Sequence, residues 1–207
     1  MGPCELSELD SAIALFEFES ISAGIVAGDA MVKTSPLGAI YAGTVHPGRY
    51  LVLVTGDTAS VDEAVRVGHG AESLSDMVFL PDVHPAVADA VTGNISLATV
   101  GEESLGIVET TTVAAAIDAA DAGAKAADVD LAAIRLADGL GGKGYVLFSG
   151  AVAEVEAALA AAVGRADGHG SLVRSDLIAQ LHREMAENLR TDLRFLSRLS
   201  APPNRGE

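Results

Sequence analysis

The sequence contains one structural pattern twice, and this duplication restricts the possible folds more than any other feature. A shift of 92 positions aligns charged residues as well as apolar ones: Glu17 with Glu109, Asp29 with Asp121, and Lys33 with Lys125. The matches continue at a shift of 94, as between Gly56 and Gly150, so the second copy has two extra residues in an intervening loop. A repeat of this length predicts two similar domains related by a pseudo-symmetry axis.

Each copy is predicted to form a β-α-β-β-α-β unit, the split βαβ pattern of ferredoxin-like domains. In the first copy a strand over 13–18 leads into a helix over 23–34, which Ser20 or Ser22 caps and which ends before Pro36. The other expected elements are strands over 37–45, 50–55, 76–80, 105–109, 131–137, 145–149 and 171–175, and helices over 61–68, 113–127 and 152–165. Thr58 or Ser60 is expected to cap the helix over 61–68, and residues 92–103 form the linker. The predicted fold class is therefore α/β of the α+β type.

Composition limits the class of protein. The formal net charge of −16 argues against binding to nucleic acid, because phosphates would be repelled. No apolar stretch reaches about 18 residues, so we expect no membrane span. A single cysteine, Cys4, and a start that lacks a basic, apolar leader favour a cytoplasmic location. The positive mean hydropathy of +0.35 favours an oligomer that buries additional apolar surface.

The duplicated stretch resembles the signature of bacterial microcompartment (BMC) shell proteins. Leu105-Gly-Ile-Val-Glu-Thr110 and the alanine-rich segment 115–127 carry the resemblance, as do residues 16–17 and 28–33. Two copies in this order resemble the non-permuted tandem-domain members. Segments 44–49, 80–87 and 139–143 are similar to the tandem shell protein of propanediol-utilisation compartments.

The resemblance implies two BMC domains, over residues 11–92 and 104–185, and a C-terminal helical tail over 186–207. It implies a homotrimer with pseudo-hexameric symmetry that tiles with other shell proteins into the facet of a cytoplasmic compartment. It also implies a structural protein without catalytic residues, and a central pore that passes small polar metabolites.

The resemblance assigns two sets of site residues. The pore-lining set lies in the loop after the second strand of each domain: Val45, His46, Pro47, Gly48, Asp138, Gly139, Leu140, Gly141 and Gly142. The edge set, which contacts neighbouring tiles, is Asp29, Lys33, Asp121 and Lys125. Glycine suits a pore loop because it permits positive φ and leaves backbone amides accessible.

No cofactor is expected. In the propanediol relative a cysteine of the first pore loop holds an iron–sulfur cluster, but His46 stands at that position here and Cys4 lies outside the domain. Because such clusters are held mostly by thiolates, we expect none. Three copies of His46 could instead bind zinc or an anion. The simpler alternative, which we favour, is that His46 only narrows and polarises the pore.

Two other functions remain open. Gly139 to Gly144 fits the G-x-G-x-x-G pattern of a nucleotide-binding enzyme, but a strand is expected to follow it where the fingerprint requires a helix. A trimeric regulatory protein that binds a small molecule is the other alternative. Asp118 and Asp121 share a helix face, and we interpret them as solvated surface residues.

The C-terminal segment from Leu177 to Leu199 is predicted to be helical, with Leu189, Leu193 and Leu196 on one stripe. The stripe could pack on the protein's own trimer, or it could dock an encapsulated enzyme through residues 186–207.

Overall fold

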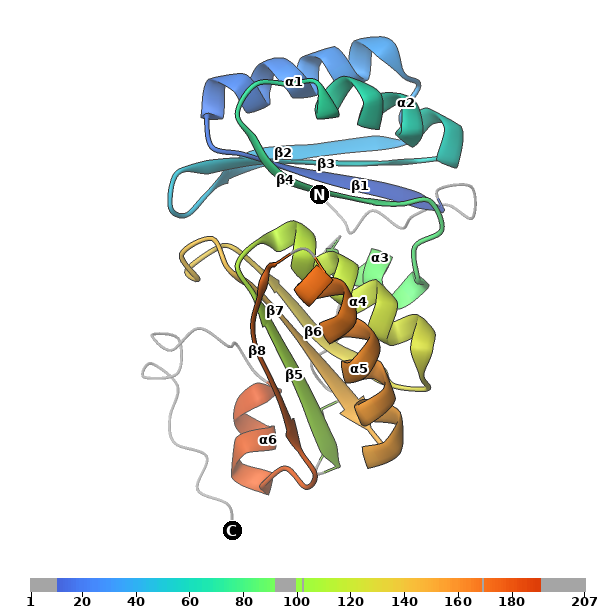
Figure 1. The fold of residues 1–207 in the computed structure, drawn as a ribbon, viewed down its shortest axis with the longest axis vertical. Helices are drawn as coiled ribbons and strands as arrows, with labels where there is room; N and C mark the ends of the chain where they lie inside the picture. Colours follow the sequence, from blue (N-terminus) through green and yellow to red (C-terminus); the bar gives the residue numbers. More distant parts are fainter. Residues whose placement is uncertain (1–10, 92–99, 102, 169, 191–207) are drawn as a thin grey trace.

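The computed structural model describes residues 11–91, 100–101, 103–168 and 170–190, and it contains two domains in succession (Figure 1). The first domain consists of β1 (Ala12–Phe18), α1 (Ile21–Thr34), β2 (Ala39–Val45), β3 (Arg49–Gly56), α2 (Thr58–His69) and β4 (Leu74–Leu80). The short helix α3 (Pro85–Val91) follows it. The second domain consists of β5 (Ser104–Thr110), α4 (Val113–Ala126), β6 (Asp130–Leu136), β7 (Gly144–Gly150), α5 (Val152–Gly168) and β8 (Leu172–Ile178), and α6 (Arg183–Leu189) follows.

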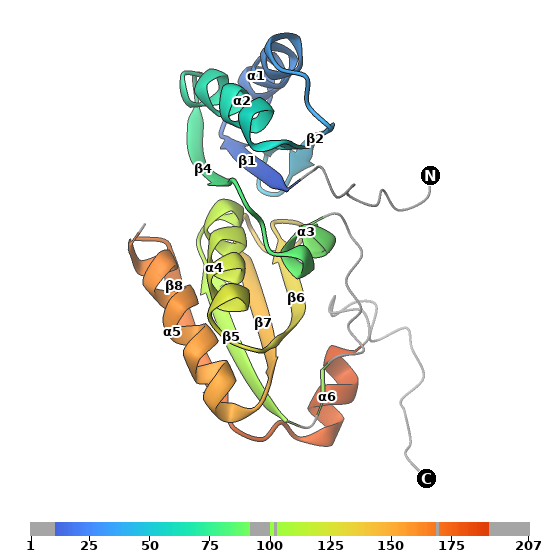
Figure 2. The same cartoon turned by 90° about the vertical axis from the view of Figure 1, so that its right-hand side faces the viewer.

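The two sheets have the same topology, which confirms the predicted duplication. The strand orders are β2-β3-β1-β4 and β6-β7-β5-β8, and every neighbouring pair is antiparallel. One face of each sheet carries two helices, α1 and α2 in the first domain and α4 and α5 in the second (Figure 2). Each domain is therefore a two-layer α+β unit in the predicted element order.

The helices begin where short polar side chains can accept hydrogen bonds from backbone amides. Ser20 caps α1 and Thr112 caps α4, each through a hydroxyl oxygen 3.3 Å from the amide three residues on. The predicted caps of α2 were wrong, because Asp57 takes that place and accepts the amides of Ala59 and Ser60, both at 3.0 Å. The hydrogen bond from the Ser60 hydroxyl holds the pKa of Asp57 below its usual range.

The two extra residues lie in the β6–β7 loop, as predicted. The β2–β3 loop comprises 46–48, between the paired Val45 and Arg49. The β6–β7 loop comprises 138–142, between Ala137 and Lys143, whose amide and carbonyl lie 3.0 Å apart. The connection between α4 and β6 is shorter than the equivalent connection between α1 and β2. A register irregularity in β6 between residues 131 and 133 restores the alignment of the two copies.

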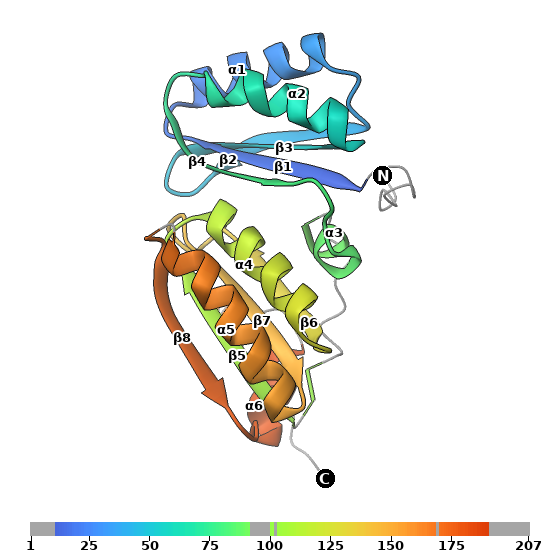
Figure 3. The same cartoon turned by 45° about the vertical axis from the view of Figure 1, so that its right-hand side comes forward.

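One of three hydrophobic clusters among the described residues spans both domains. The helix-covered face of the first sheet has its own cluster, which includes Phe16 and Phe18. The opposite face contributes Ile13 and Leu15 to a cluster that continues through α3 into the second domain, where it includes Ile117. Figure 3 shows α4 approaching the face of the first sheet that α1 and α2 do not cover. Among the described residues, no helix has the length and hydropathy needed to cross a membrane.

Candidate assembly surface and pore loops

Helix α4 is the main contact between the domains. It packs on β1 and β4 of the first domain and on α3. Eleven of its fourteen residues are buried, including Val113, Ala114 and Ile117. Burial on this scale stabilises the joint by about 1.5–3 kcal/mol for each large apolar side chain. We call this contact the internal joint.

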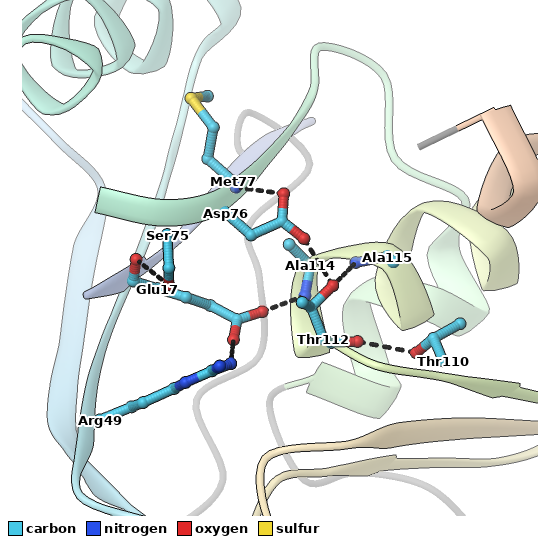
Figure 4. A network of polar contacts seen from close by, with 9 residues as sticks. All are labelled: Glu17, Arg49, Ser75, Asp76, Met77, Thr110, Thr112, Ala114 and Ala115. Atoms are coloured by element: carbon cyan, nitrogen blue, oxygen red, sulfur yellow. Dashed lines mark hydrogen bonds and ion pairs between the residues drawn. The ribbon is translucent and has the colours of Figure 1, made fainter. Parts of the chain in front are cut away.

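A buried carboxylate receives the first turn of α4 at the internal joint (Figure 4). Glu17 is 1% exposed, and its Oε1 accepts the amide of Ala114 at 2.7 Å. Its Oε2 lies 3.3 Å from Nη1 of Arg49. Negative charge is favourable at this place because the amides at a helix N-terminus carry partial positive charge. Burial raises the pKa of Glu17, against the lowering effect of the Ala114 amide and of Arg49.

A second polar contact lies beside Glu17. The Thr112 hydroxyl donates a hydrogen bond to the Asp76 carboxylate, which also accepts the Met77 amide at 2.8 Å (Figure 4). The proximity of Asp76 to Glu17 also raises the pKa of Glu17. Both carboxylates therefore meet the start of α4, one at the helix amide and one at the capping residue.

A third contact holds the far end of α4. Asp121 accepts the amide of His84 at 2.8 Å and pairs with Nζ of Lys125 at 2.7 Å. The Lys125 ammonium also donates to the carbonyl of Asp82. Two residues of the expected edge set therefore contact the segment that follows β4, although the Lys125 side chain remains 41% exposed. We call this pair and its counterpart on α1 the Asp–Lys clasps.

Our interpretation of Asp118 and Asp121 as solvated residues was wrong. Each is only 5% exposed, because the first domain and α5 cover the helix face that carries them. The guanidinium of Arg165 balances the charge of the Asp118 carboxylate, with Nη2 2.7 Å from Oδ1. This pairing raises the pKa of the guanidinium.

Helix α1 occupies the equivalent position in the first domain, but its equivalent face is bare. The exposed apolar side chains are Ile21 (40%), Ile25 (52%), Val26 (69%) and Val32 (42%). Its clasp, Asp29 with Lys33 at 2.5 Å, makes no hydrogen bond or ion pair with another segment in the part of the chain that the structure describes. A row of four exposed aliphatic side chains on one helix indicates an interaction surface.

Two grooves flank α1. One, of about 430 Å³, lies between α1 and α2 and is lined by Ser20, Ser22, Ala23, Val26, Ala27, Ala30, Val67, Ala71, Glu72 and Ser73. The other, of about 220 Å³, lies between α1 and β2 and includes Ile25, Asp29 and Ile40. On the second domain the corresponding places are occupied by β4 and α3 of the first domain.

The repeat extends further than the sequence reading found. Residues 83–84 (Val-His) recur at 181–182 (Leu-His), and both segments precede a short helix. The amides of Val83 and Leu181 bond in the same way, to the carbonyls of Ser11 and Glu103 at 2.9 and 3.0 Å. Helix α6 is therefore the counterpart of α3. The recurrence of Val-His as Leu-His is the sequence signal that could have revealed this correspondence.

The predicted helix from Leu177 is wrong at its start, since β8 continues to Ile178 and α6 begins only at Arg183. Leu181, Ala186 and Leu189 pack in a cluster on the second domain. Leu193 and Leu196 lie outside the described residues.

The structure brings the two expected pore loops together. A Cβ added at Gly142 would lie 3.2 Å from Cδ of Pro47 and 3.8 Å from the carbonyl oxygen of His46. His46 and Asp138 are both exposed. At the base of the second loop Lys143 pairs with Glu109 at 2.7 Å, as Arg49 pairs with Glu17 in the first domain.

The loop 139–144 does not have the geometry of a dinucleotide site, because Gly144 begins strand β7 where a helix would be needed. Within the described ranges no cluster of three metal-ligating side chains occurs in one chain. A ring of His46 would require several chains.

Comparison with known proteins agrees with this architecture. Residues 12–83 and 104–181 each match the BMC domain. The chain is 36% identical over 179 residues to the bacterial microcompartment shell protein PduT of Citrobacter freundii, which covers 86% of this chain and 96% of that protein. A crystal structure of a microcompartment protein from Desulfitobacterium hafniense superposes with a TM-score of 0.74 at 40% identity, covering 85% of this chain and 98% of that one. The fused permuted hexameric shell protein MSM0275 of the RMM microcompartment shares the fold, with a TM-score of 0.54 at 22% identity over 76% of this chain and 84% of that chain.

Proposed function

We propose, since this chain belongs to the BMC-domain family, that it is a structural shell protein of a bacterial microcompartment in the cytoplasm. The observation that supports this proposal most strongly is the difference between the two equivalent helices: the first domain covers α4, whereas the equivalent face of α1 is exposed. A second copy of the chain can cover α1 with the surfaces that correspond to β4 and α3, namely β8 and α6. Repetition of this contact closes a ring of six domains from three chains, a closed symmetry of the kind most oligomers use.

The paired residues around the joint support this assembly. Glu109 is the counterpart of Glu17 and is free to receive the amide of Ser22 from a neighbouring α1 N-terminus, in addition to its pair with Lys143. Met185, which corresponds to the buried Val87 of α3, is 52% exposed and is available to enter the groove beside β2. The Asp29–Lys33 clasp then holds the neighbour's segment after β8, as Asp121 and Lys125 hold residues 82–84.

The edge role of the lysines fits the same arrangement. Lys33 and Lys125 keep 71% and 41% of their side chains exposed. We infer that each lysine uses this remaining exposure to contact a neighbouring tile, while Asp29 and Asp121 hold its ammonium in place. The long aliphatic stem of lysine can pack along such a contact while its charge stays solvated.

The pore is proposed to lie where the loops 46–48 and 138–142 meet. In a closed trimer each loop occurs three times around one axis. Exposed His46 and Asp138, with bare glycine backbone, present polar groups to a passing solute. Small polar metabolites are the class of solute that fits such a lining.

Electron microscopy of the purified full chain tests the shell function. A tile forms flat sheets or tubes, and it is recovered in closed shells when co-expressed with hexameric shell proteins. Discrete particles with saturable nucleotide binding, abolished by Lys143→Ala, would instead support the enzyme alternative. Discrete trimers that bind a small molecule and never tile would support the regulatory alternative.

We also propose that the pore holds no iron–sulfur cluster, because the first loop offers an imidazole in place of a thiolate. Reconstitution of untagged protein with iron and sulfide tests this. The His46→Cys variant should bind iron and gain visible absorbance, and the natural chain should do neither. Zinc bound by the natural chain but absent from His46→Ala would instead show a histidine metal ring.

We propose that the C-terminal tail contributes to recruitment of encapsulated enzymes. The tail boundary at residue 186 falls inside α6, which packs on the second domain through Ala186 and Leu189. Deletion of 191–207 is therefore the cleaner test, because it spares this helix. Loss of co-purified cargo with assembly intact supports recruitment, and unchanged cargo contradicts it.

A further inference from the structure

One buried carboxylate contacts both the internal joint and the meeting point of the two loops, and it uses a different oxygen for each. Oε1 of Glu17 accepts the amide of Ala114 at 2.7 Å, whereas Oε2 lies 3.3 Å from Nη1 of Arg49 (Figure 4). Charge-assisted hydrogen bonds are usually about 2.7–2.9 Å long, so the contact with Arg49 is the looser of the two. A change at Oε2 can therefore act on Arg49 while α4 stays in place.

The guanidinium of Arg49 lies beside the β6–β7 loop. A Cβ built at Gly142 would be 3.7 Å from Nη1 of Arg49, close to Pro47 and to the carbonyl oxygen of His46. Gly142 is buried, whereas Gly139 of the same loop is exposed and has open space around it. Arg49 therefore lies where the β2–β3 loop supports the β6–β7 loop.

The surroundings of Glu17 favour the uptake of a proton. The charged side chains that face it are Arg49 of β3 and Asp76 of β4. Helix α4 presents backbone amides to it, and the first charged residue of this helix, Asp118, is paired with Arg165. Helices α1 and α2 lie on the opposite face of the sheet. Burial raises the pKa of Glu17 and Asp76 adds to this effect, although the helix amides and Arg49 act in the opposite direction.

The proton has a definite place on the carboxyl group. Oε1 of Glu17 already accepts the Ala114 amide, so the proton binds to Oε2. An O–H group at Oε2 then faces the guanidinium of Arg49, and both groups are donors. The charge-assisted contact with Arg49 is lost, whereas the neutral carboxyl group still accepts the helix amide through Oε1.

We propose that Arg49 is a positioning residue of the pore, which holds the β6–β7 loop while Glu17 is ionised and releases it when Glu17 takes up a proton. This inference rests on the pore proposed above and adds what controls the position of its lining. Acidification therefore loosens the loop 138–142 without opening the internal joint.

The second domain lacks this arrangement. Glu109, the counterpart of Glu17, is 36% exposed, and its partner Lys143 is 49% exposed. Arg174 lies opposite Glu109 in the sheet register, at the position where the first domain has Asp76 opposite Glu17. The counterpart of the buried carboxylate is thus a solvated one, and we expect the proton to act through the first domain.

A nitroxide spin label at position 140 of the full chain tests the proposal. Leu140→Cys in a Cys4→Ser background places the label on the β6–β7 loop, and its electron paramagnetic resonance spectrum reports the mobility of that loop. Loss of a hydrogen bond to a charged group shifts an equilibrium by roughly tenfold or more. The ratio of mobile to immobile label should therefore rise by roughly this factor in one titration step between about pH 8 and about pH 5.5.

Two variants are expected to remove this step. Glu17→Gln keeps an oxygen for the Ala114 amide but has no charge for Arg49, so its label should be mobile throughout the pH range. Arg49→Gln should be equally mobile and equally insensitive to pH. Arg66→Gln is the matched control, because Arg66 also pairs with a glutamate, Glu63, but lies on α2. Its label should titrate like that of the natural chain.

The outcomes separate this inference from the pore on which it rests. Mobility that does not change with pH in the natural chain, or a step that persists in Glu17→Gln or Arg49→Gln, overturns the coupling, once circular dichroism shows that the variants are folded. The contact among Glu17, Arg49 and Gly142 lies within one chain, so the step is expected in the dissociated chain and in the trimer. A step in a chain that never forms trimers would support the coupling and overturn the pore alone.

Discussion

Helices α1 and α4 are the same element in two surroundings. Each has fourteen residues, begins at a hydroxyl cap and carries an Asp–Lys pair four residues apart near its end. Yet eleven residues of α4 are buried and only four of α1. The difference comes from the first domain, which covers α4, whereas none of the described residues covers the equivalent face of α1. We propose that another copy of the chain covers the apolar side chains exposed on α1.

The largest expected difference in the free energy of unfolding is between alanine substitutions at Ile117 and at its counterpart Ile25. Ile117 is fully buried, so Ile117→Ala should lower the free energy of unfolding by about 2–5 kcal/mol through lost burial and a cavity. Ile25 is 52% exposed, so Ile25→Ala should change the stability of the dissociated chain by less than about 0.5 kcal/mol. Urea unfolding at low protein concentration measures both. Equal losses would show that the helices do not differ as described.

The next effect concerns Glu17 and its counterpart Glu109. Glu17→Ala leaves the buried amide of Ala114 without an acceptor and should cost about 1–3 kcal/mol. Glu109 is 36% exposed, so Glu109→Ala should cost the dissociated chain less than about 1 kcal/mol. The account predicts that Glu109→Ala instead weakens the trimer. A variant that leaves assembly unchanged would contradict the proposed role of Glu109.

The raised pKa of Glu17 predicts a pH dependence of definite sign. The folded chain keeps this proton to higher pH than the unfolded chain, whose carboxyl has the ordinary value of 4.5. The stabilising contribution of this proton is complete below that value and is lost as pH rises through the folded pKa. The free energy of unfolding of the natural chain, relative to Glu17→Gln, should therefore fall as pH rises from about 4 to 7. A difference that rises over this range would contradict the burial of the carboxylate.

A smaller effect is expected at the contact between the pore loops. Gly142 has a φ of +89°, and a Cβ there would crowd Cδ of Pro47 at 3.2 Å, so Gly142→Ala should cost the roughly 1–2 kcal/mol of backbone strain and, in addition, the cost of displacing Pro47. Gly139 has a φ of +76° with open space around it and serves as the control for backbone strain alone. Thermal unfolding followed by circular dichroism measures both. A loss no larger than that of Gly139→Ala would show that the loops are not in contact.

The smallest effect distinguishes the two Asp–Lys clasps. The Lys33 pair is exposed at both side chains, so Lys33→Ala should change the stability of the dissociated chain by less than about 0.5 kcal/mol. Lys125 also holds the carbonyl of Asp82, and Lys125→Ala should cost about 1 kcal/mol. In the assembled protein the two losses should become similar, as measured by thermal unfolding at high concentration. A persistent difference would argue that α1 is not held as α4 is.

Much of the fold could be predicted from the sequence because it is local and repeated. The element order, a cap at Ser20 or Ser22 and the two extra loop residues follow from periodicity and alignment of the copies. The burial of Asp118 and Asp121 could not be predicted, because it depends on a covering domain far away in the chain. The true start of α6 was missed because apolar and charged spacing from Leu177 onward also suits a helix.

The role of the edge and pore residues depends on copies of the chain that no single sequence specifies. What the sequence does provide is the pairing of positions, such as Asp29 with Asp121. The structure then shows what one member of each pair contacts. The other member is expected to make the same contact with a neighbouring chain.

The accessibility of position 25 tests the central claim most directly. A thiol introduced by Ile25→Cys in a Cys4→Ser background can be titrated with maleimide across protein concentration, beside Arg66→Cys as an exposed control. The account predicts that labelling at position 25 slows by at least tenfold as light scattering reaches three times the 21.0 kDa mass of one chain, while the control stays reactive. Unchanged labelling in an assembled trimer, or a mass that never exceeds one chain, would contradict the claim that a second copy covers α1.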